Sequence, residues 1–123
     1  MHLNIKLLCN TAETQSKGLM FSDPLSLYDC AFFVFNHLDS HSFWNKNVDF
    51  PISLCFLDEN FKIQDIGELK EHQETPCRSK YPLTKYVVEG HIDLPKELNI
   101  KIGDFFFPEK NKLKILTRED KNN

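Results

Sequence analysis

The sequence predicts a mainly β fold, a β-rich α+β domain in which a compact single-domain barrel or sandwich-like sheet carries one short N-terminal helix. Polar and apolar residues alternate over 3–8, "LNIKLL", as they do in a strand with one buried face. The run "CAFFVF" at 30–35 is apolar throughout, which indicates a strand buried on both faces. The chain also holds 11 Phe, a residue that buries a large area without a polar atom, so we expect a Phe-rich core.

Further strand patterns follow along the chain. They lie at 43–48, 52–58, 62–66, 86–92, 105–107 and 112–116. The polar stretch "NHLDSHS" at 36–42 predicts a loop after the first apolar run. The sequence "ENF" at 59–61 predicts a tight hairpin turn, and Gly103 with Asp104 predicts another turn because this pair tolerates unusual backbone angles.

Helical signals are confined to two places. Asn10 with Glu13 three residues later has the form of a capping box, so a short helix is expected from about Thr11. Gly18 stands where that helix can end, because glycine readily adopts the conformation that follows a helix. The stretch "LPKEL" at 94–98 predicts one further helical turn.

Residues 1–116 are expected to form a single domain, since a chain of 123 residues has the usual size of one. Within this domain, 67–85 is polar, contains two prolines and shows no clear period. We therefore predict a long irregular loop there, and such loops are often functional or mobile. The polar end of the chain, 117–123, is predicted to be a flexible tail.

Charge and hydropathy argue against two classes of partner. The net charge is -3 and the basic residues are scattered, whereas a nucleic-acid binder normally presents a basic face. The longest apolar stretch, at 31–35, is too short to span a bilayer, so no membrane attachment is expected. The N-terminus lacks the pattern of a secretory signal, which predicts a cytoplasmic protein whose four cysteines are free thiols.

Several segments, in this order, resemble the domain-of-unknown-function family 192. They are Lys17–Phe21, Phe33–Phe35, Phe43–Trp44 with Lys46–Asn47, Pro51–Ile52, Phe56–Asp58, Pro76–Cys77 with Tyr81, Tyr86–Glu89 and Ile100–Asp104. The resemblance covers about residues 3 to 107. It implies a compact, mainly β, barrel-like domain of the kind found in bacteria, archaea and some phages, and it implies no assigned activity. Family members often carry an export signal, and the N-terminal pattern of this sequence predicts none.

Trp44 and Lys46 form the first candidate binding site. As a strand, 43–48 would place both side chains on one face, with Asn47 on the other. An indole beside an ammonium group can bind an anionic or sugar-like ligand by stacking and charge-assisted hydrogen bonds. In the alternative interpretation Trp44 packs at the edge of the core, the stem of Lys46 lies across it, and Asn47 caps the backbone where the strand ends.

Cys77 is the second candidate and lies in the irregular segment, which also holds Tyr81. Arg78 or Lys80 could lower the pKa of the thiol, and His72 or His91 could act as a base. In the alternative interpretation the cysteine is structural or incidental. We assign no catalytic residue from the sequence.

The sequence predicts neither a metal site nor a cofactor. His37 and His41 have the spacing of two ligands on a helix, but they lie in a stretch of loop composition without a third ligand. Two solvated loop histidines are the simpler interpretation. With four glycines in the whole chain there is no glycine-rich phosphate loop.

Two functions of different classes are compatible with the sequence, and a third is also compatible with it. The first is a non-catalytic module that binds a small ligand or a protein partner through Trp44, Lys46, Asn47 and the 67–85 loop. The second is an enzyme, a hydrolase or another thiol-dependent type, that uses Cys77 with a histidine. The third is a structural or regulatory protein of a phage or its host.

Overall fold

The computed structural model describes residues 1–117, and β structure dominates it. The strands are β1 (His2–Cys9), β2 (Asp29–Asp39), β3 (Ser42–Phe43), β4 (Ile52–Leu57), β5 (Ile63–Leu69), β6 (Cys77–Arg78), β7 (Thr84–His91), β8 (Phe105–Glu109) and β9 (Lys112–Leu116). The helices are α1 (Ala12–Lys17) and α2 (Leu94–Glu97). The mainly β prediction is confirmed, and most of the predicted tail, 118–123, lies outside the described residues.

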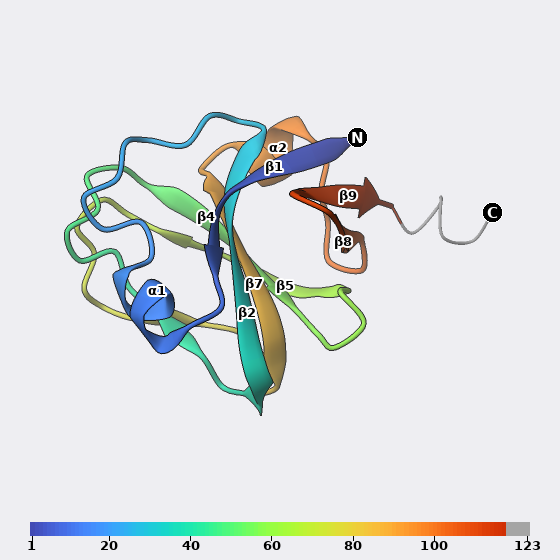
Figure 1. Cartoon of the computed structure of the whole chain (residues 1–123), viewed down its shortest axis with the longest axis horizontal. Coiled ribbons are helices and arrows are strands. Elements are labelled where there is room, and N and C mark those ends of the chain that lie inside the picture. The colour runs from blue at the N-terminus through green and yellow to red at the C-terminus, as the bar shows by residue number, and fades with distance from the viewer. Residues whose placement is uncertain (118–123) are drawn as a thin grey trace.

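Seven strands form one sheet that curls into a half-barrel (Figure 1). Their order is β5-β4-β7-β2-β1-β9-β8; β1 and β2 are parallel, and the other neighbouring pairs are antiparallel. The two outer edges meet where Lys62 forms a bridge with Phe105. The backbone N–H of Ile63 donates to the carbonyl of Asp104 at 2.8 Å beside this bridge. Backbone pairing therefore joins the ends of the curled sheet.

The sheet is buried on both faces, which explains why its central strands are apolar throughout. An inner core fills the curl and consists of Leu3, Cys30, Phe32, Cys55, Leu57, Ile63, Val88, Leu94, Ile100, Phe106, Leu113 and Ile115. An outer core lies on the other face and consists of Cys9, Leu19, Ala31, Phe33, Phe43, Val48, Phe50, Ile52, Leu54, Phe56, Leu69 and Val87. Successive residues of β2 and β4 alternate between the two cores, as the pleat of a strand requires.

The predicted N-terminal helix is present, but it begins at Ala12, one residue later than expected. Thr11, and not Asn10, is the N-cap: its hydroxyl accepts from the backbone N–H of Thr14, and the Thr14 hydroxyl accepts from the backbone N–H of Thr11. A threonine pair thus replaces the predicted Asn–Glu capping box. The helix ends at Gly18, whose φ of 49° is in the region that favours glycine.

The segment 36–48 differs most from its prediction. The polar stretch after the apolar run is not a loop, because β2 continues through Asp39. The strand predicted at 43–48 is wrong beyond Phe43, where β3 ends, and a turn at Lys46 and Asn47 follows. Asn47 has φ 60°, which an extended strand does not allow. The polar run is therefore strand except at Ser40 and His41, which connect β2 to β3, and the Trp-containing run is mostly turn.

The segment 67–85 contains more regular structure than its composition suggests. β5 continues through Leu69, β7 already begins at Thr84, and β6 pairs with β3 in the middle. β6 pairs two residues with two, Phe43 with Cys77 and Ser42 with Arg78, and so short a strand leaves no alternating pattern. The helical turn α2 and the turn at Gly103 occur where they were expected.

Candidate functional site

A hollow of the molecule lies beside α1 and is called here the α1 pocket. It has a volume of about 390 Å³ and runs between α1, with the residues Gly18–Met20 that follow it, and side chains of β2, β3 and the turn after β3. One of its buried polar residues is Glu89 of β7, which is 4% exposed. In Figure 1, α1 lies alongside the sheet, close to the strands that supply this wall.

Glu89 occupies the middle of the sheet because β7 lies between β4 and β2. Its direct neighbours are Leu54 and Ala31, and it points to the same face as Val87, which belongs to the outer core. Burial raises the pKa of the Glu89 carboxyl to about 8. No other residue among 1–117 forms a side-chain hydrogen bond or ion pair with this carboxyl group. The pocket thus contains a buried acid that is largely protonated at neutral pH.

The end of α1 lies directly over this acid. A Cβ on Gly18 would lie 3.5 Å from Cζ of Phe33 and 3.9 Å from Oε1 of Glu89. The amide of Gln15 ties the helix to the sheet, since its Nε2 donates to the carbonyls of Cys9 at 3.3 Å and Val34 at 2.8 Å. The helix wall of the pocket is therefore held by hydrogen bonds to two strands.

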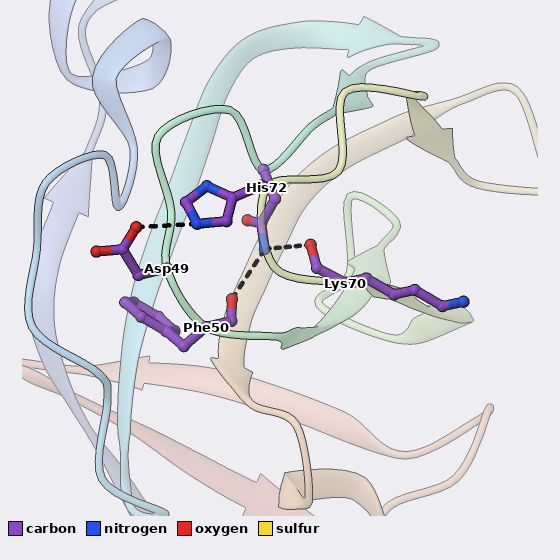
Figure 2. A network of polar contacts seen from close by, with 5 residues as sticks. Asp49, Phe50, Lys70 and His72 are labelled. Atoms are coloured by element: carbon purple, nitrogen blue, oxygen red, sulfur yellow. Dashed lines mark hydrogen bonds and ion pairs between the residues drawn. The ribbon is translucent and has the colours of Figure 1, made fainter.

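Asn45 supplies the second buried polar group of the α1 pocket and is 1% exposed. Its Nδ2 donates to the carbonyls of Phe50 and Lys70, each at 3.0 Å, and these two carbonyls appear in Figure 2. Because both acceptors are carbonyls, the NH₂ end of the amide must face them. Within the described chain, Asn45 Oδ1 is the buried side-chain oxygen or nitrogen that has no hydrogen-bond partner.

Aromatic rings form much of the remaining wall. Phe33 and Phe43 meet edge to face, with ring centroids 5.1 Å apart. Phe35 stacks on His41 at 3.6 Å, and burial lowers the pKa of that imidazole. His41 is consequently neutral at pH 7, and it is a ring of the pocket wall rather than a solvated loop residue. His37 lies in β2 and is exposed.

The structure places Trp44 and Lys46 together, although not on a strand. Lys46 Nζ lies over the indole ring, 5.4 Å from its centroid, and Trp44 is 46% exposed. Trp44 lines the α1 pocket and also a second hollow of about 320 Å³, which includes Glu74 and Pro76 of the predicted loop. Asn47 is exposed in the turn and lines neither hollow. The tryptophan is thus shared by two hollows.

Cys77 and Tyr81 lie away from the α1 pocket. Cys77 packs against the outer core, where its Sγ would be 2.8 Å from a Cβ on Gly67. Burial, and secondarily the carboxylate of Asp65, raises the pKa of the Cys77 thiol. The expectation that Arg78 or Lys80 lowers this pKa is therefore wrong. Tyr81 is 53% exposed, and its backbone N–H donates to the hydroxyl of Ser79.

The two histidines considered as bases for Cys77 have other partners. His72 Nε2 lies 3.2 Å from Oδ1 of Asp49, as Figure 2 shows. His91 Nδ1 accepts from the backbone N–H of Asp93 at 3.0 Å. All four cysteines are free thiols, three of them buried.

Glu89 and Asn45 were not among the residues predicted for the site. A signal for Glu89 exists in "YVVEG", where a glutamate interrupts an apolar strand that otherwise reads as buried. Asn45 carries no comparable signal. Its burial depends on hydrogen bonds to the carbonyl groups of Phe50 and Lys70, and the sequence does not reveal that these groups lie beside it.

Residues 1–117 contain no group of three or more His, Cys, Asp or Glu side chains placed to hold a metal ion. In the same residues, no helix has the length and apolar character needed to cross a membrane.

Comparisons with known proteins identify relatives of unassigned activity. A crystal structure of a protein of unknown function from Novosphingobium aromaticivorans DSM 12444 is 31% identical, with a TM-score of 0.75 over 80% of this chain and 70% of that one. A candidate transcription regulator from Sinorhizobium meliloti 1021 is 24% identical, with a TM-score of 0.76 over 88% and 78%, and supports the fold alone. No curated protein matches the chain. The family DUF192, described as "Uncharacterized ACR", matches residues 3–106, and the chain therefore belongs to it.

Proposed function

We propose that this protein is a non-catalytic binding module that takes a small molecule into the α1 pocket. The observation that carries the proposal is an almost fully buried acid, Glu89, on the wall of a hollow that also contains Asn45, whose buried Oδ1 has no hydrogen-bond partner among the described residues. Buried polar groups in proteins are nearly always hydrogen-bonded, because leaving one unpaired costs about 1–3 kcal/mol. A ligand that pairs with them recovers this free energy.

The surroundings of these groups suit a small molecule. Ligand pockets usually combine apolar and aromatic walls with a few polar groups that fix the orientation of the ligand. The α1 pocket has this composition, with Phe33, Phe43 and Trp44 in its wall, and its volume of about 390 Å³ falls within the usual range of ligand sites. Trp44 of the sequence-based hypothesis therefore keeps its proposed binding role, in a different setting from the one expected.

The thiol-dependent alternative has less support. The raised pKa of Cys77 reduces its thiolate fraction at neutral pH, whereas a nucleophilic cysteine needs a lowered one. We propose a cytoplasmic location for the binding module, which the four free cysteines favour.

A fragment screen with two matched variants tests the proposal. Trp44→Ala removes an aromatic side chain that lines the α1 pocket, and Tyr81→Ala removes one of similar exposure that does not. We expect fragments that raise the Tm of the wild type to act equally on Tyr81→Ala and at least several-fold more weakly on Trp44→Ala. Fragment binding that is the same in all three proteins, or no fragment binding to the wild type, would contradict the proposed site.

A further inference from the structure

Three polar side chains of the α1 pocket, Gln15, Asn45 and ionised Glu89, offer only hydrogen-bond acceptors to a ligand. Both N–H groups of the Asn45 amide are engaged by carbonyls, so only its oxygen is available. The amide of Gln15 is in the same state, because its Nε2 donates to the carbonyls of Cys9 and Val34. The carboxyl of Glu89, once ionised, only accepts. A ligand that pairs with these three groups while Glu89 is ionised must therefore donate.

The buried wall contains no cation that could neutralise Glu89. Lys17 lines the pocket, but it is exposed, so its ammonium group is hydrated and screened. The other titratable groups near the carboxyl are Cys9 of β1 and His41 beside β3. Burial raises the pKa of Cys9 to about 12 and lowers that of His41, so both are neutral between pH 7 and pH 9. β2 and β4 contribute Ala31 and Leu54, which carry no charge.

The aromatic wall favours the same kind of ligand. The faces of aromatic rings attract cations, by about 2 kcal/mol when the site is desolvated. Phe33 and Phe43 lie in the wall as an edge-to-face pair, and Phe35 and His41 as a stacked pair. Lys46 over Trp44 already shows this interaction at the exposed rim. Rings and a carboxyl in one hollow are a combination suited to an organic cation.

Building on the proposed function, we infer that the α1 pocket binds a small organic cation, whose nitrogen donates to the Glu89 carboxylate while its carbon body packs on the aromatic rings. A planar, multiply donating group such as a guanidinium or amidinium fits best, because two of its N–H groups can donate to the two oxygens of a carboxylate at once. Binding moves one proton from Glu89 to solvent, since the ligand pairs with the ionised form.

Three probes of similar shape and different charge test the inference: benzylguanidinium, benzylurea and phenylacetate. Calorimetry at pH 8.5 should give a Kd for benzylguanidinium at least ten-fold lower than for benzylurea, and no binding of phenylacetate. Since the cation requires ionised Glu89, its affinity for the wild type should fall towards ten-fold per pH unit below about 8. Benzylurea should show no such dependence.

The variant Glu89→Gln should lose both the preference for benzylguanidinium and its pH dependence. Glu59→Gln is the matched control, because Glu59 is an exposed carboxylate outside the pocket, and it should behave as the wild type. Equal or tighter binding of benzylurea or phenylacetate, a wild-type affinity independent of pH, or no binding of benzylguanidinium at millimolar concentration would overturn the cation assignment. If the cation assignment fails but other fragments bind the wild type and bind Trp44→Ala more weakly, the proposed function still holds. If no such fragments are found either, the proposed function fails as well.

Discussion

At the scale of single residues, Glu89 has the largest consequence for the behaviour of the protein. A carboxyl in the outer core lacks water, so its neutral form is favoured and its pKa rises from 4.5 to about 8. In the unfolded chain the same group ionises near its ordinary pKa. The folded protein therefore holds a proton that the unfolded chain releases between about pH 4.5 and 8, and stability must fall over this interval.

Glu89→Gln should remove this loss, because an amide has the shape of the acid and does not ionise. Relative to the variant, the wild type should lose about 3 kcal/mol of unfolding free energy between pH 5 and pH 8. Urea unfolding of both proteins at several pH values measures the difference. The exposed control Glu59→Gln should follow the wild type, and a constant difference between wild type and Glu89→Gln would show that Glu89 ionises normally.

Asn45 supports the structure from the same wall, and its loss should be costly. Its Nδ2 satisfies the carbonyls of Phe50 and Lys70, so Asn45→Ala leaves both without this donor. At about 1 kcal/mol or more for each bond and an added small cavity, we expect a loss of about 2–4 kcal/mol of unfolding free energy. Asn60→Ala, at an exposed turn, should change stability by less than about 0.5 kcal/mol in the same urea titration.

At the scale of elements, sequence pattern located the core of the sheet and failed where a segment depends on distant partners. The apolar runs of β2 and β4 are readable because both faces are buried along their length. β6 cannot be predicted from the sequence, because this two-residue strand is defined by its pairing with β3. Likewise, the turn after Phe43 is held by the hydrogen bonds that Asn45 donates to the carbonyls of Phe50 and Lys70. Of the candidate site, pattern alone identified Trp44 and missed the two buried polar groups.

The contact between β5 and β6 allows a test of how closely these elements pack. An added Cβ at Gly67 would lie 2.8 Å from Cys77 Sγ, closer than side chains tolerate. Gly67→Ala should lower the unfolding free energy by about 1–3 kcal/mol, as overpacking usually does. In the Cys77→Ala background, where Sγ is absent, the same substitution should cost clearly less. Equal costs in both backgrounds would show that β6 does not press on β5.

At the scale of the whole molecule, the two cores determine which cysteines are accessible. Cys30 and Cys55 belong to the inner core and Cys9 to the outer one, and burial raises the pKa of all three to about 12. Cys77 is the half-buried exception. Reaction with a thiol reagent needs both access and thiolate, so opening of the entire fold governs the three buried groups.

An aromatic disulfide reagent at pH 7.5 should therefore label one thiol of the folded protein, and more slowly than it labels free cysteine. Mass spectrometry should locate the label on Cys77, and Cys77→Ser should show no labelling on the same timescale. Denaturant should expose the remaining three together. A second cysteine that reacts in the folded protein as fast as Cys77 would contradict the burial described here.

The pairing of β1 with β9 has a consequence for how the protein is made. Residues 2–4 pair in antiparallel fashion with Lys112–Lys114. In the described chain, β1 is synthesised first and β9 last, so this pairing cannot form until synthesis of β9 is complete. Until β9 leaves the ribosome, one edge of β1 is bare and the inner core lacks Leu113 and Ile115. Such distant pairings slow folding and leave apolar surface uncovered. The nascent chain therefore keeps this apolar surface uncovered until β9 has been synthesised.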